Sequence, residues 1–284
     1  MPELPEVETV RCQLAPVLTG GTFIGVEKTE PFILRDCTEV EFRALLPGQR
    51  VETVERLGKF IIVRTEGRAE VYLTLHLGMT GQVLVRGSDS TPAGERLETH
   101  PHTRFLLRLR NAQGTTDLIE FRDARKFGRV HLTLGSPPSR LQGLGPDAWQ
   151  GDWDAGYLGA RLRGRRAPLK AFLLDQRHLA GIGNIYADEI LWWTELSPLR
   201  EAGSLNEVEV DTLAGEIRSR LEDGVRRLGC SLSDFVDTEG RPGTFQDHLR
   251  AYQRQGLPCV RCGVTMVRVV VAGRGTAYCP GCQR

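Results

Sequence analysis

Four of the seven cysteines are spaced as ligands for a metal ion. They form the series Cys259-x2-Cys262-x16-Cys279-x2-Cys282 near the C-terminus. Two Cys-x2-Cys knuckles can supply four thiolates to a tetrahedral Zn²⁺, which leaves no open coordination position, so the spacing predicts one structural zinc ion. The residues between the knuckles (MVRVVVAGRGTAY) predict a hairpin that turns at Gly273-Arg274-Gly275, and a unit this small needs the metal to fold.

The N-terminal sequence MPELPEVETV places a proline directly after the initiator methionine. Removal of Met1 would expose Pro2 as a secondary amine. An α-amino group has a pKa of about 7.7–8.0, against about 10.4 for lysine, so more of it is neutral and nucleophilic near pH 7. Such an amine can form a covalent iminium intermediate. Proline also follows methionine in many ordinary exposed termini, so Pro2 by itself is only a candidate nucleophile.

The formal net charge of +1 conceals a strongly uneven distribution of charge. Residues 241–284, 161–177 and 103–131 carry net charges of +6, +5 and +4. Residues 201–223 carry a net charge of −5. Three basic segments that converge in the fold would attract one polyanion, although an ordinary solvated surface would explain the same charges.

The segment AGIGNIYADE (180–189) predicts a glycine-containing turn that runs into a helix. Backbone N–H groups at such a turn and at a helix N-terminus can bind an anion. Asn184 adds a side-chain donor at the same place. The pattern is short, and it is also typical of a plain turn between two helices.

The first half of the chain predicts a β-rich domain behind an N-terminal helix. Residues 1–11 predict an arm that runs into a helix, because Pro5 suits a first helical turn and the acids Glu6 and Glu8 favour a helix N-terminus. Between residues 22 and 134, short apolar or alternating runs predict about eight strands. Their short spacing predicts an antiparallel β-sandwich.

The second half predicts helices and ends in the cysteine unit. Residues 135–150 are rich in Gly and Pro and predict a linker. Apolar spacing near 3.6 residues predicts four helices, over 152–161, 168–178, 185–193 and 206–227. Residues 229–247 predict a loop region before the cysteine unit. The overall fold class expected is therefore α+β with several domains.

Composition excludes some classes of protein. Of the 284 residues, 40% are hydrophobic and 26% charged, as in soluble globular proteins. No run of 18 apolar residues could span a membrane, and the acidic N-terminus is unlike a secretory signal. The scattered Cys12, Cys37 and Cys230 suit a reducing compartment. We therefore expect a cytoplasmic protein with no membrane partner.

Motifs along nearly the whole chain resemble the bacterial formamidopyrimidine-DNA glycosylase family. They are MPELPEVETV, Lys59, HLGMTG at 76–81, DARKFG at 123–128, GIGNIYADE at 181–189 and the cysteine unit, in the family's order. The resemblance implies an N-terminal β-sandwich, a helical helix–two-turn–helix domain and a C-terminal zinc finger. We divide the chain into a catalytic arm and sandwich (1–134), a linker (135–150), the helical domain with a lesion-recognition loop (151–250) and the finger (251–284).

The resemblance also implies the chemistry. In the family, the N-terminal proline attacks C1′ of a damaged nucleotide, Glu3 is the general acid at the sugar ring oxygen, and Glu6 helps to position the terminus. Lys59 matches the lysine that contacts phosphate and donates a proton in β-elimination. Arg274 matches the finger arginine of the δ-elimination step. An arginine is a poor proton donor, so we expect Arg274 mainly to clamp the departing phosphate.

Further positions match residues that hold DNA in the family. The side chains that fill the gap left by an extruded nucleotide fall on Met79, Arg125 and Phe127, which on pattern alone would also fit a sandwich core. The positions that match DNA contacts are His76, His100, Arg125, Arg165, Lys170 and Asn184.

The resemblance implies a base-excision-repair enzyme. It would remove oxidised purines such as 8-oxoguanine and formamidopyrimidines from double-stranded DNA, act also on abasic sites, and cut the strand as an AP lyase through a Schiff base on Pro2. We expect it to work as a monomer with one zinc ion. Two stretches depart from the common pattern: Gly243-Thr244-Phe245 in the recognition loop, where many relatives have an aromatic residue in the middle, and Asp123-Ala124-Arg125-Lys126-Phe127, where relatives often have Pro and a second Arg.

Three alternatives remain open at this point. A sister enzyme for oxidised pyrimidines usually begins Pro-Glu-Gly-Pro-Glu, whereas this chain has Leu4 at the third of those positions. A zinc-containing DNA-binding protein without catalysis would leave Pro2, Glu3 and Lys59 unexplained. A zinc-ribbon interaction module fused to a β domain would explain neither the gap-filling residues nor the turn at Asn184.

Overall fold

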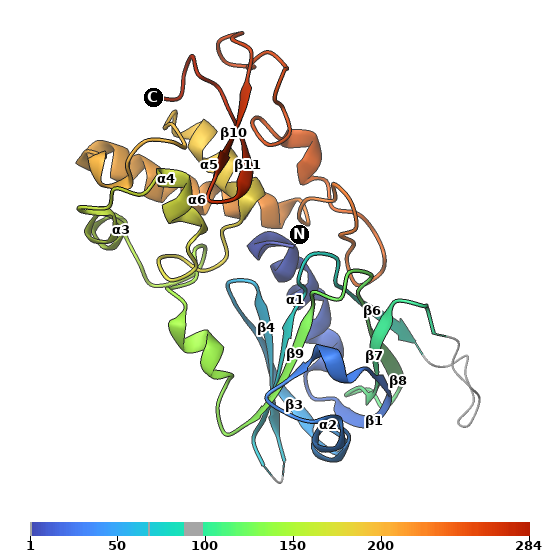
Figure 1. Ribbon diagram of the computed structural model, residues 1–284. Coiled ribbons are helices and arrows are strands. Elements are labelled where there is room, and N and C mark those ends of the chain that lie inside the picture. The colour runs from blue at the N-terminus through green and yellow to red at the C-terminus, as the bar shows by residue number, and fades with distance from the viewer. Residues whose placement is uncertain (1, 68, 88–98) are drawn as a thin grey trace. The chain divides into compact units, whose positions relative to one another are not determined.

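The computed structural model describes residues 2–67, 69–87 and 99–284. The chain divides into two compact units. The first comprises residues 1–142 and 228–244, and the second comprises residues 143–227 and 245–284. Figure 1 shows a β-rich first unit and a mainly helical second unit that carries a small hairpin. Each unit is described separately below.

The first unit is built on a nine-stranded sheet, with the order β2-β9-β5-β4-β3-β1-β7-β8-β6. Its helices are α1 (Leu4–Leu18) and α2 (Glu39–Leu45). Its strands are β1 (Thr22–Thr29), β2 (Leu34–Arg35), β3 (Arg50–Leu57), β4 (Phe60–Glu66), β5 (Val71–His76), β6 (Gln82–Gly87), β7 (Thr103–Arg110), β8 (Thr116–Arg122) and β9 (Arg129–Leu134). The pairs are antiparallel except for β2 with β9, which the sequence did not indicate.

The sheet folds into two layers around one hydrophobic core. Its two halves are joined where β1 meets β3, at the single pair Thr22 and Arg50. Apolar side chains from both halves, such as Leu73 on β5 and Phe121 on β8, lie in the same core. Strand residues that alternate between two faces can supply such a core from both layers, so the expected sandwich is confirmed.

Helix α1 packs on this core through one apolar stripe. Val7, Val10, Leu14 and Leu18 are buried and belong to the core cluster, at spacings that bring them onto one helical face. The N-terminal turn of α1 is therefore held against the sheet rather than left as a free arm.

Helix α2 was not expected from the sequence, although a signal for it was present. Thr38 and Glu41 form a capping box, in which Glu41 N–H donates to Thr38 Oγ1 at 3.2 Å and Thr38 N–H donates to Glu41 Oε2 at 2.7 Å. A Thr-x-x-Glu sequence before an apolar residue is the usual mark of a helix start.

The second unit contains four α-helices and a two-stranded hairpin in the part of the chain that the structure describes. The elements are α3 (Ala155–Leu162), α4 (Leu169–Leu174), α5 (Asn184–Trp193), α6 (Glu207–Arg226), β10 (Val267–Val271) and β11 (Arg274–Tyr278). Helix α4 ends four residues earlier than expected, because Asp175 takes an extended backbone conformation. No helix among the described residues is long and apolar enough to cross a membrane.

The hairpin turns one residue earlier than the sequence suggested. Ala272 and Gly273 have φ values of 49° and 71°, and Val271 pairs with Arg274 across the turn. Two successive positive φ angles define the type I′ turn that joins closely paired strands. Arg274 is therefore the first residue of β11 rather than the tip of the turn.

Candidate active site

The N-terminal turn of α1 is buried and rich in carboxylates. Pro2 is buried, and Glu3 caps the helix at its N-terminus. Glu3 and Glu6 are each only 1% exposed. Glu6 Oε2 accepts the backbone N–H of Glu3 at 2.7 Å, as part of a capping box. The sequence-predicted nucleophile and its two acids are thus adjacent and fixed by the same turn, while Met1 lies outside the described residues.

The second oxygen of Glu6 holds the loop at 228–244. Glu6 Oε1 accepts the backbone N–H of Cys230 at 2.7 Å. Gly229 has φ +81°, and a Cβ there would lie 2.7 Å from Glu6 Cγ. Only glycine fits this backbone and this close approach. The expected recognition loop is therefore anchored to the terminal turn, a link that no local pattern could indicate.

The same loop has further anchors on α1. Gln13 donates to Asp237 Oδ2 at 3.0 Å and accepts the backbone N–H of Thr238 at 2.9 Å. Because the loop touches α1 at both Glu6 and Gln13, its path is tied to the helix that carries Pro2.

Glu8 is a buried acid with a structural role that the sequence analysis missed. Arg11 and Arg56 both donate to its carboxylate, Arg56 Nε at 2.8 Å. Burial by itself would raise the pKa of Glu8, but the hydrogen bonds from Arg11 and Arg56 hold it below the usual value. Glu8 therefore stays ionised and ties α1 to β3.

Lys59 lies in the tight turn between β3 and β4. The turn depends on Gly58, which has φ +54°, and Lys59 itself is half-buried. His76 lies at the end of β5, where its ring packs on Phe60 with centroids 4.8 Å apart. Burial, together with the nearby positive charge of Lys59, lowers the pKa of His76 to about 4. His76 is therefore neutral at physiological pH and can donate or accept a hydrogen bond there.

The three predicted gap-filling residues lie on two loops that pack against each other. Met79 is half-buried in the loop after β5, and Arg125 and Phe127 are exposed in the loop after β8. A Cβ on Gly78 would lie 2.5 Å from the carbonyl carbon of Phe127, so the two backbones touch. The Arg125 guanidinium lies 5.1 Å from the centre of the Phe127 ring. Phe127 is 46% exposed, so it is not a core residue.

A single buried carboxylate organises both loops. Asp123 Oδ1 accepts the Thr80 hydroxyl at 2.5 Å and the Arg125 N–H at 3.2 Å, and Asp123 Oδ2 accepts the Gly128 N–H at 2.6 Å. The loop with Met79 and the loop with Phe127 are thereby fixed to each other. Sequence reasoning quoted Asp123 in a motif but gave it no role.

In the second unit, Asn184 and Lys170 both reach the hairpin strand that begins with Arg274. Asn184 begins α5, and its Nδ2 donates to the Gly275 carbonyl at 3.0 Å. Lys170 is fully buried and forms an ion pair with Asp188 at 2.6 Å. Burial raises the pKa of Asp188 to about 7, although Lys170 opposes that shift. The ammonium of Lys170 is thus directed into the protein, whereas Arg274 is exposed.

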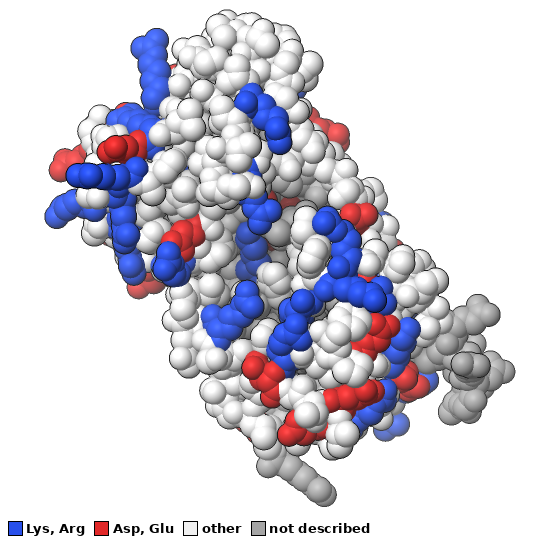
Figure 2. Space-filling view, in the orientation of Figure 1, with Lys and Arg blue, Asp and Glu red and all other residues white. Residues whose placement is uncertain are grey.

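His100 and Arg165 are exposed at separate places. His100 lies before β7 in the first unit, where desolvation and the nearby Arg122 lower its pKa. Arg165 follows α3 in the second unit, among the exposed Arg161, Arg163 and Arg166. Figure 2 shows Lys and Arg side chains on the surface of each unit, with Asp and Glu side chains interspersed among them.

The four predicted zinc ligands come together. The Sγ atoms of Cys259, Cys262, Cys279 and Cys282 all lie within 4.8 Å of one another. A tetrahedral zinc with Zn–S bonds of about 2.3 Å requires sulfur atoms about 3.8 Å apart, so the cluster fits a zinc ion. The described residues contain no other cluster of this kind.

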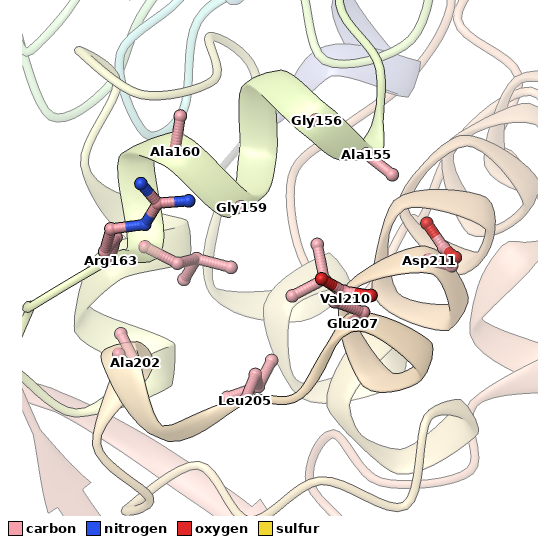
Figure 3. Close-up of a pocket in the computed structure, with 12 residues that line it drawn as sticks. Ala155, Gly156, Gly159, Ala160, Arg163, Ala202, Leu205, Glu207, Val210 and Asp211 are labelled. Carbon is pink, nitrogen blue, oxygen red and sulfur yellow. The ribbon is translucent and has the colours of Figure 1, made fainter.

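A separate pocket contains none of the predicted site residues. It has a volume of about 400 Å³ and lies in the second unit between α3, α6 and the segment at 202–205. Figure 3 shows its small lining residues, among them Gly156, Gly159 and Ala160 on α3, with Glu207 and Asp211 on α6.

Three family models match successive parts of the chain. The formamidopyrimidine-DNA glycosylase N-terminal domain matches residues 1–130, its H2TH domain matches residues 144–236, and the zinc finger found in FPG and IleRS matches residues 256–284. Together with the terminal turn and the cysteine cluster, these matches define a DNA-repair glycosylase with a zinc finger.

Relatives that match over their full length belong to the same family as the three family models. The chain is 41% identical to a formamidopyrimidine-DNA glycosylase of Chloroflexus aurantiacus, covering 100% of this chain and 98% of the relative. It is similar to the crystal structure of the MutM (Fpg) protein of Thermus thermophilus, with a TM-score of 0.83, 41% identity and coverage of 99% and 98%. It is also similar to a Lactococcus lactis FPG mutant in complex with Fapy-dG containing DNA, with a TM-score of 0.87, 31% identity and full coverage of both chains. The chain belongs to the formamidopyrimidine-DNA glycosylase family and is an enzyme that acts on damaged DNA.

We predict that Asp123→Asn loosens the contact between the two loops that carry the predicted gap-filling residues. The amide cannot accept all three donors, so the loops should lose their mutual position and base excision under single-turnover conditions should fall on the order of tenfold. Stability should fall by about 1–3 kcal/mol, measured by urea unfolding.

Asp117→Asn is the matched control. Asp117 also accepts a side-chain hydrogen bond in this unit, from Asn111 at 2.8 Å, but it lies at the other end of β8. Excision at the wild-type rate by Asp123→Asn would contradict the role of Asp123.

Proposed function

We propose that this enzyme removes oxidised purines, such as 8-oxoguanine and formamidopyrimidines, from double-stranded DNA and then cuts the strand as an AP lyase. The observation that carries the proposal is the buried terminal turn, in which Pro2 directly precedes Glu3, and Glu3 and Glu6 are both almost fully buried. After removal of Met1, Pro2 would present a secondary amine next to these acids, and a positioned amine of this kind is a nucleophile.

The reaction would begin at the sugar of the damaged nucleotide. The lone pair of the Pro2 nitrogen attacks C1′, the base leaves with the electrons of the glycosidic bond, and the proton released from the proline nitrogen neutralises the departing base. Glu3 protonates the ring oxygen as the C1′–O4′ bond breaks and the nitrogen forms a C=N bond. The product is an iminium, the Schiff base, and since the proline nitrogen keeps no proton, its positive charge cannot be lost by deprotonation. That charge acidifies C2′ for the next step.

Strand cleavage would follow by two eliminations. Loss of a C2′ proton expels the 3′ phosphate with the electrons of its C–O bond, and Lys59 serves as phosphate contact and proton donor in this β-elimination. A second elimination expels the 5′ phosphate. Arg274, which remains cationic, stabilises that departing phosphate as a clamp.

The remaining predicted residues would hold the duplex. Extruding one nucleotide costs about a few kcal/mol, and Met79, Arg125 and Phe127 would fill the gap, with Arg125 bonding to the orphaned base. His76, His100, Arg165 and Asn184 would contact DNA around the lesion. Lys170 remains a predicted DNA contact, although its ammonium is directed into the protein. The enzyme would act as a monomer in the cytoplasm.

The cysteine cluster would hold one structural zinc ion. Four thiolates complete a tetrahedral shell, so the ion supplies folding energy to the hairpin that carries Arg274 and takes no part in the reaction. We also propose that the chain is organised as an N-terminal arm and sandwich, a linker, a helical domain and a zinc finger.

Borohydride trapping on a duplex with one 8-oxoguanine tests the proposed nucleophile. Reduction converts an iminium into a stable crosslink, and mass mapping should place it on residue 2 of a chain that lacks Met1. Pro2→Gly is the informative variant, because a terminal glycine keeps a primary amine and should still trap, at a lower rate.

A second lesion separates purine from pyrimidine specificity. A thymine glycol duplex should trap more slowly than the 8-oxoguanine duplex. Absence of any crosslink and of strand cleavage, with folded and zinc-loaded protein, would overturn the proposal.

Removal of zinc should abolish DNA binding. Cys262→Ser should lose the metal, as measured by native mass spectrometry, and fluorescence anisotropy should then show no specific binding because the hairpin unfolds. Cys12→Ser, which changes an exposed thiol outside the cluster, should keep both the zinc ion and specific DNA binding. Undiminished binding after verified zinc loss would refute the structural role of the ion.

A further inference from the structure

A fully buried ion pair links two helices of the second unit to the hairpin strand. Lys170 on α4 is 0% exposed and Asp188 on α5 is 1% exposed. Their Nζ and Oδ1 atoms lie 2.6 Å apart. Burying two charges costs more than burying two apolar side chains of similar size, so this pair is a poor way to gain stability alone.

Both members of the pair also form hydrogen bonds to β11. Lys170 Nζ donates to Thr276 Oγ1 at 2.8 Å and to the Gly275 carbonyl oxygen at 3.3 Å. Asp188 Oδ2 accepts the Ala277 N–H at 3.1 Å. These bonds fix three consecutive residues of the strand, in one register and one orientation.

The fixed residues directly follow Arg274. Thr276 Oγ1 donates to the Arg274 carbonyl at 3.1 Å, and Asn184 Nδ2 donates to the Gly275 carbonyl at 3.0 Å. The Arg274 side chain is exposed at the start of the strand. Its backbone is therefore connected to the buried pair through one hydroxyl and one peptide unit.

We propose that Lys170 and Asp188 are positioning residues for Arg274. The pair fixes the start of β11, so the guanidinium is presented from a rigid strand end instead of a mobile two-stranded hairpin. The inference rests on the proposed function, in which Arg274 assists departure of the 5′ phosphate. Displacement of a reacting group by about 1 Å can cost on the order of 100-fold in rate, so the anchoring of this strand governs the second elimination.

The test measures the two eliminations separately. A 5′-labelled duplex with a preformed abasic site gives an unsaturated aldehyde end after β-elimination and a 3′-phosphate end after β,δ-elimination, and the two resolve on a gel. In Asp188→Asn, δ-elimination should slow on the order of 10- to 100-fold. The rates of imine trapping and β-elimination should change less than about twofold, since they need no guanidinium. If the pair only stabilised the fold, both eliminations would slow alike and the ratio of the two products would not change.

Thr276→Val is the second variant, because it removes the hydroxyl between Lys170 and the Arg274 carbonyl without leaving a buried charge unpaired. Like Asp188→Asn, it should slow δ-elimination and leave more of the unsaturated aldehyde product. Asp223→Asn is the control. Asp223 lies on α6 and accepts a hydrogen bond from Arg227 Nε at 3.0 Å, and its loss should leave the ratio of the two products unchanged.

A double-mutant cycle shows whether the pair acts through Arg274. Asp188→Asn should slow δ-elimination in the wild-type background and have no further effect in an Arg274→Gln background. An unchanged product split in both Asp188→Asn and Thr276→Val overturns the proposal, as does an equal loss of trapping and of both eliminations. Wild-type protein that neither traps nor cleaves would instead refute the proposed function, and this inference with it.

Discussion

One buried carboxylate, that of Glu6, holds the terminal turn and the loop at 228–244 in place. It is almost completely removed from water, and each oxygen accepts one backbone N–H at 2.7 Å, from Glu3 on one side and Cys230 on the other. A buried carboxylate without donors would be strongly destabilising, so these two bonds must form together in the folded state. As a result the terminal turn with Pro2 and the loop at 228–244 have one common anchor.

Buried carboxylates fix irregular backbone in the same way at two other places. Asp123 accepts donors from both of the loops that carry the proposed gap-filling residues. Glu189 on α5 accepts the backbone N–H groups of residues 250, 251 and 252, each at 2.8 Å, and so fixes the chain that leads into the cysteine cluster. Buried carboxylates can bind several N–H groups at once, which suits them to holding irregular backbone that has no sheet or helix to satisfy it.

Features with a local cause could be predicted from the sequence. The spacing of Cys259, Cys262, Cys279 and Cys282 sufficed for the metal cluster, because each knuckle is set by neighbouring residues. The two-layer sheet followed from period-two alternation. The parallel pair of β2 with β9 and the inward direction of Lys170 did not follow, since both depend on residues far away along the chain. Glu6 was assigned to the terminus, but its bond to Cys230 spans more than two hundred residues and leaves no local pattern.

The most direct test of the central claim is the rate of imine formation by Glu6→Gln on a preformed abasic site, measured by rapid-quench borohydride trapping. This substrate needs no base excision, so the rate reports only the placement of the terminal amine. A Gln side chain has one acceptor oxygen in place of two, and the amide group must face one of the backbone N–H groups. We expect imine formation to slow on the order of 10- to 100-fold, with unchanged zinc content and circular dichroism. A wild-type rate in the folded variant would contradict this role of Glu6.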